Sequence, residues 1–403
     1  MSGGNYCAIY DFELFPYALG DVLTWNVQTA ILCEEAGRER VDVYVCMDER
    51  YPASIFQLGM VTADNYGLMF NELFGAFGTH PCLANLFIYQ NRDEMLERLA
   101  EVNKGDATNL NVVNEYRGAL ALRAAEPSMR QLITSALKRI EEKPTPIVEY
   151  FSKYIYSHDR INSFAEKYGR IPLLRSSMGC EPDVTSLITK RFSDKRIVVV
   201  HSRLRRLDVG FGAGKTYARD SDFLEWYEFL KEAAKEFPDV QFVVVGRLQE
   251  KPLELLRLAN VTSLRPFGLG LGHELSLMLR SDLFIGTSSG FAAMANFSKL
   301  PYFVTKMTPA SCTAYGIDQN SERLPFATER QILVYQPETR GLLMKLLARG
   351  LQGVSTRSGN PPPPRMRSTF GVGNGNVPNS CTPVRRLADF SPMTLIATKK
   401  LHS

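Results

Sequence analysis

The sequence lacks several features that would assign a function class directly. None of its 403 residues lies in an apolar run of about 18 or more, so no membrane-spanning helix is predicted. The first residues, MSGGNYCAIYDF, show no basic start followed by an apolar stretch, so no signal peptide is predicted. No GxGxxG fingerprint opens the first predicted helix, which argues against a standard NAD enzyme. We therefore expect a cytoplasmic protein.

Cysteine pairs at metal-binding spacing are also absent. The seven cysteines are scattered along the chain, and no two of them form a CxxC pair. Such an odd and dispersed set predicts reduced cysteines in or near the core rather than a zinc site or a disulfide framework. They are Cys7, Cys33, Cys46, Cys82, Cys180, Cys312 and Cys381.

A genuine excess of positive charge is missing from most of the chain. The formal net charge is +4, but residues 351–403 carry seven basic side chains and one acidic side chain. The other 350 residues therefore carry a net charge of −2. A nearly neutral body gives no support to a nucleic-acid-binding function.

What is present is a repeated strand–helix pattern in the first 180 residues. Apolar runs at 6–10 and 41–46 predict two strands, and the helical stretch 22–36 lies between them. This β–α–β order is typical of a parallel sheet. Further along, the pattern predicts a strand, a helix and a mostly helical segment: 85–89, 92–102 and 111–170.

The pattern becomes clearer in residues 181–352. Near-continuous apolar strands alternate with helices, which is typical of a parallel sheet that helices cover on both faces. The strands are predicted at 196–201, 241–246, 282–286 and 302–305. The helices are predicted at 184–192, 222–237, 253–258, 273–280, 291–297 and 342–351.

Length and pattern together predict an α/β protein of two Rossmann-like domains, because single cores stop growing near about 250–300 residues. We place the N-terminal domain, with its helical insertion, at 1–180 and the C-terminal domain at 181–352. Residues 353–403 are rich in Pro, Gly, Ser and Asn without periodicity, and we predict that they are disordered.

Three predicted strand ends carry candidate ligand-binding residues. Thr287, Ser288, Ser289 and Gly290 follow a strand and open a helix, where backbone N–H groups and hydroxyls favour an anion such as a phosphate. The alternative is an ordinary helix cap made by Ser or Thr. In open α/β sheets ligands bind at the carboxyl ends of the strands, which favours the anion site.

The segment His201 to Asp208 follows another strand end and contains three arginines. Arginine side chains can make bidentate contacts to phosphates, and Arg203 lies closest to the strand. Arg205 and Arg206 are further candidates, and the alternative is a solvated basic loop. His201 either orients a ligand or is a strand-end histidine whose hydrogen bonds the protein satisfies.

Two further loops belong to the same candidate site. Gly210 to Thr216 resembles a P-loop, but the spacing of its glycines fails by one residue, so we favour a flexible loop that closes over a ligand. Tyr217 and Arg219 in this region are predicted to contact that ligand. Gly246 and Arg247 end the next strand, where a base or ribose could bind; the alternative is an ordinary turn.

The candidate catalytic residue is Asp21, which follows Gly20 at the start of the first helix. It either caps that helix or acts as a general base. Asp48, Glu49 and His158 are other candidate bases. Asp220 and Asp222 have the spacing of a metal-binding DxD motif, but they more naturally cap the helix that follows, so no metal site is predicted.

Residues 280–304, RSDLFIGTSSGFAAMANFSKLPYFV, resemble the nucleotide-sugar site of GT-B glycosyltransferases, which have two facing Rossmann-like domains. Within that family, His201-x-Arg203 resembles the His-x-Arg region of the α1,6- and protein O-fucosyltransferases, in which the arginine contacts the diphosphate of GDP-fucose. Leu204 separates Arg203 from the pair Arg205-Arg206, whereas the family has adjacent arginines. The heptosyltransferase-like branch, with an ADP-sugar donor, fits the same segment.

This resemblance implies a metal-independent, inverting transfer of a sugar from a nucleotide-sugar to a glycan or other hydroxyl acceptor. The nucleotide-sugar is a substrate, and no cofactor is expected. The N-terminal domain would then lie on the acceptor side. Peripheral membrane association stays open. The alternatives are a non-catalytic GT-B-like binding or scaffold protein, a nucleotide-sugar epimerase and a P-loop kinase.

Overall fold

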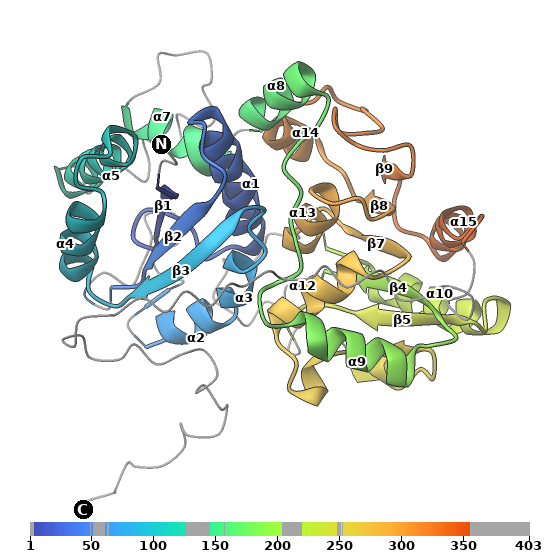
Figure 1. The fold of residues 1–403 in the computed structure, drawn as a ribbon. Helices are drawn as coiled ribbons and strands as arrows, with labels where there is room; N and C mark the ends of the chain where they lie inside the picture. Colours follow the sequence, from blue (N-terminus) through green and yellow to red (C-terminus); the bar gives the residue numbers. More distant parts are fainter. Residues whose placement is uncertain are drawn as a thin grey trace, which may run out of the picture. The chain divides into compact units, whose positions relative to one another are not determined.

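The computed structural model describes most of the chain up to residue 354 (Figure 1). Residues 1–359 form one compact unit. The described residues are 4–48, 50, 61–62, 64–125, 146–156, 158–203, 220–247, 251 and 253–354. The predicted disordered tail, 353–403, lies almost entirely outside them.

The N-terminal half is built on a parallel sheet whose described strands have the order β1-β2-β3. Figure 1 shows α4 and α5 on one face of this sheet and α1 on the other, and contacts of β1 and β2 with these helices agree. The strands are β1 (Tyr6–Asp11), β2 (Val41–Cys46) and β3 (Leu83–Tyr89). The helices are α1 (Leu19–Glu35), α2 (Tyr66–Asn71), α3 (Phe74–Phe77), α4 (Arg92–Val102), α5 (Ala107–Ala125), α7 (Pro146–Phe151) and α8 (Asp159–Tyr168).

The C-terminal half is built on a second parallel sheet with the strand order β6-β5-β4-β7-β8-β9. The strands are β4 (Arg196–His201), β5 (Val240–Val244), β6 (Val261–Thr262), β7 (Leu283–Thr287), β8 (Tyr302–Thr305) and β9 (Gln331–Leu333). The helices are α9 (Glu181–Arg191), α10 (Phe223–Glu236), α11 (Leu253–Leu256), α12 (Leu271–Leu279), α13 (Gly290–Asn296), α14 (Pro309–Tyr315) and α15 (Arg340–Gly350).

The two faces of the second sheet bury different cores, because successive side chains of a strand point to opposite faces. In β4, Val198 and Val200 join the core under α10 and α15. Ile197 and Val199 point the other way, toward α12 and α13. That second core continues without a break into the core of the N-terminal half. One apolar core therefore packs against both sheets.

Two pairs of glycines bring the halves into backbone contact. A Cβ added to Gly290 would lie 2.9 Å from the backbone nitrogen of Gly20, where α13 meets α1. A Cβ added to Gly75 would lie 2.5 Å from the backbone nitrogen of Gly272, where α3 meets α12. A side chain at Gly290 or Gly75 would overlap the facing backbone, so glycine at these two positions permits the helices to approach this closely.

The predicted strands and helices are largely confirmed, with shifts at their ends. β4 and β8 have the predicted bounds, and Asp222 caps α10 by accepting hydrogen bonds from the N–H groups of Leu224 and Glu225. The capping role considered for Asp21 is wrong: α1 begins at Leu19, and Asp21 lies inside its first turn. The helix starts earlier than predicted, so that Gly20 belongs to it and packs against Gly290. The domain boundaries at residues 180 and 352 remain a prediction.

Candidate functional site

The second sheet has a topological switch point between β4 and β7. The chain runs outward from β4 through β5 to β6 on one side and from β7 through β8 to β9 on the other. In doubly wound sheets ligands bind in the crevice outside the strand ends at such a point. His201 ends β4 and Thr287 ends β7, and the two strands pair in register there. The described residues of three predicted ligand-binding loops, 201–203, 246–247 and 287–290, therefore follow strands at one edge of one sheet.

His201 is buried across this switch point. Its Nδ1 lies 3.0 Å from the Ser289 hydroxyl, and its ring centroid lies 5.0 Å from that of Phe291. Burial, with Arg203 and Lys251 nearby, lowers the pKa of His201 to about 3, so the imidazole is neutral at physiological pH. A neutral ring that joins β4 to the 287–290 loop fits the alternative of a strand-end histidine whose hydrogen bonds the protein satisfies, and the ligand-orienting role of His201 stays a prediction.

Arg203 follows β4 and is hydrogen-bonded to the segment before α10. Its backbone N–H donates to the Ser221 hydroxyl at 3.1 Å, and its carbonyl accepts from the Ser221 N–H at 2.7 Å. Its guanidinium Nε lies 3.6 Å from Oδ1 of Asp220. A phosphate at this strand end would therefore compete with the Asp220 carboxylate for Arg203.

The 287–290 loop is only partly accessible. Thr287 and Ser288 are buried, whereas Ser289 and Gly290 are partly exposed. Among the described residues, the Ser289 hydroxyl bonds to His201 and makes no side-chain cap on α13. The alternative of an ordinary Ser cap is therefore wrong at Ser289. Because α13 has only seven residues, its helix dipole is short. An anion at this loop would be stabilised more by nearby cations than by the helix.

Gly246 turns the chain at the end of β5. Its φ of +118° lies outside the range that other residues adopt comfortably. A Cβ here would lie 3.5 Å from the His201 ring, so the turn packs beside the switch point. Next to it, Nη2 of Arg247 lies 3.6 Å from the sulfur of Met69 in α2. The turn thus lies between the His201 ring and a helix from the N-terminal half.

Asp21 lies in the first turn of α1, a helix of the N-terminal half that packs against α13. It directly follows Gly20, whose backbone contacts Gly290 at the start of α13. Burial of its carboxyl raises the pKa of Asp21 to about 7. A carboxyl group with a pKa near the working pH is suited to general base catalysis.

The other described candidate bases have unsuitable environments. Asp48 is buried and pairs with Arg50, whose Nη2 lies 2.7 Å from Oδ2, and hydrogen bonds from Arg50 and Arg92 lower its pKa to about 2. His158 is buried against Phe297 and Tyr315, and burial lowers its pKa to about 4. Glu49 lies outside the described residues. Asp21 alone among the three described candidates has a pKa near neutrality.

Four predicted ligand contacts and the glycine-rich segment 210–216 lie outside the described residues: Arg205, Arg206, Tyr217 and Arg219. They stay predictions.

Lys306 follows β8 as Arg203 follows β4, and it was not predicted as a site residue from the sequence. Its Nζ donates to the carbonyl oxygen of Asp220, and its φ is +53°. The rule used for the other strand ends could have found it, since strand 302–305 was predicted correctly. Lys306 and Arg203 thus place two cations around the Asp220 segment.

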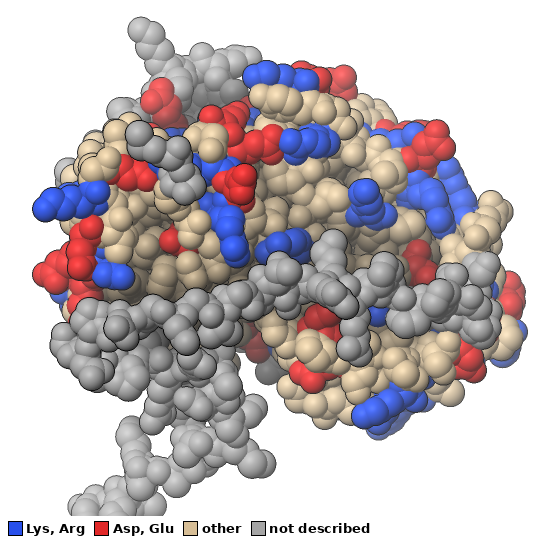
Figure 2. Space-filling model, viewed as in Figure 1, with Lys and Arg blue, Asp and Glu red and all other residues tan. Residues whose placement is uncertain are grey.

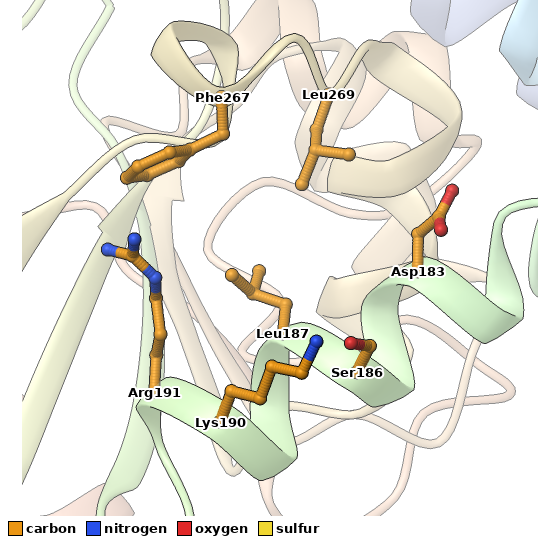
Figure 3. Close-up of a pocket in the computed structure, with 7 residues that line it drawn as sticks. All are labelled: Asp183, Ser186, Leu187, Lys190, Arg191, Phe267 and Leu269. Atoms are coloured by element: carbon orange, nitrogen blue, oxygen red, sulfur yellow. The ribbon is translucent and has the colours of Figure 1, made fainter.

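A surface pocket of about 250 Å³ lies away from these residues, between α9 and the segment that precedes α12 (Figure 3). Its lining includes Lys190 and Arg191, and the Arg191 guanidinium lies 4.4 Å from the centroid of the Phe267 ring. None of the predicted site residues lines this pocket. We therefore keep the switch point as the candidate site.

The remaining surface gives little further indication of a partner. Figure 2 shows basic and acidic side chains interspersed on one face, as expected for a nearly neutral body. Within the described ranges, no helix has the length and apolarity to cross a bilayer. The same residues contain no cluster of three or more His, Cys, Asp or Glu side chains placed to hold a metal ion.

Comparisons with known proteins establish the fold. No protein-family model matches the chain, and no curated protein matches its sequence. The structure of Escherichia coli ADP-heptose LPS heptosyltransferase II matches with a TM-score of 0.51 at 12% identity, over 87% of this chain and 99% of that one. The chain therefore has the GT-B fold, the predicted α/β architecture of two Rossmann-like sheets.

Two other solved structures have lower similarity. A family 9 glycosyl transferase from Veillonella parvula matches with a TM-score of 0.46 at 11% identity, over 87% of this chain and 99% of that one. The UDP-GlcNAc 2-epimerase of Methanocaldococcus jannaschii, in complex with UDP-GlcNAc and UDP, matches with a TM-score of 0.39 at 12% identity, over 89% and 96%.

Proposed function

We propose that this chain is a glycosyltransferase that moves a sugar from a nucleotide-sugar to a hydroxyl acceptor. The observation that carries the proposal is the position and pKa of Asp21. Asp21 lies in the first turn of α1, directly after Gly20, whose backbone contacts Gly290 at the start of α13 in the other half. Its pKa of about 7 suits a group that accepts a proton during the reaction.

In the proposed reaction, Asp21 takes the proton from the acceptor hydroxyl as its oxygen attacks the anomeric carbon of the donor sugar. The bond from that carbon to the diphosphate breaks, and the nucleoside diphosphate leaves with the electron pair. Attack opposite the leaving group inverts the configuration. Arg203 would stabilise the negative charge that develops on the diphosphate, together with donors of the Ser289–Gly290 segment. Because these groups can neutralise the charge, the proposed transfer requires no metal ion.

The nucleoside of the donor would bind at the turn Gly246–Arg247. This turn ends β5, the strand beside β4, so a nucleotide whose diphosphate lies at Arg203 would reach it. The His-x-Arg resemblance supports GDP-fucose as one donor, and the likeness of residues 280–304 to heptosyltransferases supports an ADP-sugar. The two candidate donors can be distinguished by which nucleotide-sugar the protein binds.

A thermal-shift panel of GDP-, UDP-, ADP- and CMP-sugars tests the proposal. A ligand that binds the folded state raises Tm in proportion to the logarithm of its concentration over Kd, so the matching nucleotide should stand out. The Arg203→Ala variant should lose most of this shift, because it lacks the phosphate contact. Full retention of the shift in Arg203→Ala would contradict the assignment of Arg203.

Turnover then distinguishes a transferase from the alternatives. A transferase should release nucleoside diphosphate slowly in water and faster with an acceptor, and Asp21→Asn should abolish both reactions while donor binding remains. Conversion of UDP-GlcNAc to its epimer without an acceptor would indicate an epimerase. Donor binding without turnover, in the presence of a broad acceptor set, would indicate a non-catalytic binding protein.

A further inference from the structure

A chain of four alternating charges runs beneath the turn Gly246–Arg247. Glu72, which follows α2, lies 3.2 Å from Nη1 of Arg265. Nη2 of the same arginine lies 3.0 Å from Oε2 of Glu274 in α12. The other oxygen of Glu274 lies 3.4 Å from Nζ of Lys251. The chain therefore begins in the N-terminal half and ends under β5.

The centre of this chain is deeply buried. The side chain of Glu274 is fully buried and that of Lys251 is 3% exposed. Buried ion pairs recover their desolvation cost only when further hydrogen bonds satisfy the remaining donors and acceptors. That condition is met, because the Lys251 ammonium also donates to the Val244 carbonyl at 2.8 Å and to the Ser263 hydroxyl at 2.7 Å.

The chain acts directly on the backbone of the turn. Oε1 of Glu274 accepts the N–H of Gly246 at 3.3 Å, and Lys251 holds the carbonyl of Val244, two residues earlier. Both hydrogen bonds fix peptide groups around the one residue whose φ of +118° sets the direction of the turn. All three partners of Glu274 in these contacts are donors, so the site requires a carboxylate with two accepting oxygens.

A second contact joins the same turn to the same N-terminal segment. Arg247 reaches the sulfur of Met69 in α2, three residues before Glu72. The turn is therefore connected to α2 in two ways. Arg247 contacts Met69 directly, and the charge chain links the turn to Glu72, the residue after α2. A displacement of α2 would change both connections at once.

We propose that Glu274 is a positioning residue of the nucleotide site, and that the chain Glu72–Arg265–Glu274–Lys251 couples this site to the N-terminal half. This inference rests on the proposed function, because it assigns the Gly246–Arg247 turn to the nucleoside of the donor. Glu274 contacts no reacting group. It sets the path of the backbone on which the base and ribose bind, and Glu72 makes that path depend on α2.

The test compares binding of a nucleotide with binding of pyrophosphate, which lacks the nucleoside. ADP, UDP and GDP are titrated by calorimetry, and the tightest is carried into the variants. Glu274→Gln keeps the shape of the side chain but replaces one accepting oxygen with an NH2 group. That group is itself a donor and would face the donors that Glu274 now accepts from. We expect it to weaken nucleotide binding about tenfold or more, as the loss of a charge-assisted hydrogen bond does, and to change pyrophosphate binding less than about twofold. Arg203→Ala should weaken both ligands.

Glu72→Gln is the milder second variant, since Glu72 lies at the partly exposed end of the chain and its loss should not prevent folding. We expect it to weaken nucleotide binding severalfold and leave pyrophosphate binding unchanged. Glu101→Gln is the matched control, because Glu101 pairs with Arg98 on an exposed surface of α4. It should bind both ligands as the unaltered protein does.

Two results would overturn the inference. Equal weakening of nucleotide and pyrophosphate in Glu274→Gln or Glu72→Gln would show a general structural role, and unchanged nucleotide binding in both variants would show no role at this site. An unaltered protein that binds none of the three nucleotides would instead contradict the nucleoside-diphosphate donor of the proposed reaction, and this inference with it.

Discussion

The α-carbon of Gly290 lies against the backbone of Gly20, so that a Cβ on Gly290 would be 2.9 Å from the Gly20 nitrogen and 2.7 Å from Cβ of Leu19. The relationship is not symmetrical. A Cβ on Gly20 would lie 3.4 Å from Cα of Gly290, which is an ordinary van der Waals contact. One glycine of the pair is therefore required for close packing, whereas the other has room for a methyl group.

This asymmetry predicts opposite effects of the same substitution. Gly290→Ala should destabilise the protein by about 1–3 kcal/mol through overpacking, and a gain in helix propensity of at most about 1 kcal/mol would offset only part of it. Gly20→Ala should be neutral or slightly stabilising. Urea denaturation of both variants measures the difference. Equal stability of the two would show that α1 and α13 are not in backbone contact.

The raised pKa of Asp21 predicts a pH-dependent rate. A general base acts in its ionised form, so kcat/KM should rise as pH increases through about 7 and level off above it. Asp21→Asn should remove the reaction while leaving the donor-induced Tm shift in place. A profile that is flat between pH 5.5 and 8.5 would exclude Asp21 as the base.

The same pKa predicts a stability effect with a definite sign. In the unfolded chain Asp21 ionises near about pH 3.9, whereas in the folded protein it holds its proton up to about 7. Between these values the unfolded state binds fewer protons, so this residue lowers stability as pH rises through that window. Asp21→Asn should therefore gain Tm relative to the original protein as pH goes from 4 to 8. A Tm difference that stays constant or shrinks would contradict the raised pKa.

Much of the second sheet could be predicted from the sequence because its strands are continuous and apolar. Strand 196–201 is rich in β-branched residues and buried on both faces, and its bounds are correct. The strands β6 and β9, of two and three residues, were not predicted. Elements this short have no periodicity to detect, and only pairing with neighbouring strands defines them.

Only those parts of the candidate site that directly follow a predicted strand could be predicted from the sequence. His201 and Ser289 lie at the ends of two predicted parallel strands, so they were expected at one edge of the sheet, and the strand order places them there. No local pattern indicated that Glu274 would meet Lys251 and Arg265, since these contacts join separate elements through space. The position of Asp21 was missed in part for the same reason: Gly20 was interpreted as the start of a helix, while its actual contact is with Gly290.

The ion pair between Arg203 and Asp220 predicts a gain of binding when the acid is neutralised. Asp220 lies 3.6 Å from the arginine and competes with an incoming phosphate. Asp220→Asn should therefore bind pyrophosphate about 3–10 times more tightly, the range expected when about 1 kcal/mol of competing attraction is removed. Asp222→Asn is the control, because asparagine caps a helix as well as aspartate does. Binding that weakens in Asp220→Asn would mean that Asp220 supports the site rather than competing in it.

The backbone of Lys306 predicts a difference between two small substitutions. Its φ of +53° is left-handed, a conformation that costs residues with a side chain about 1–2 kcal/mol and costs glycine almost nothing. Lys306→Gly and Lys306→Ala both lose the hydrogen bond from Nζ to the Asp220 carbonyl, so the comparison isolates the backbone. The glycine variant should be more stable than the alanine variant by about 1 kcal/mol in urea denaturation, although glycine also gives the unfolded chain more freedom. Equal stability of the two variants would contradict the left-handed conformation at residue 306. The direction of the Lys306 side chain toward Asp220 would then not depend on that conformation.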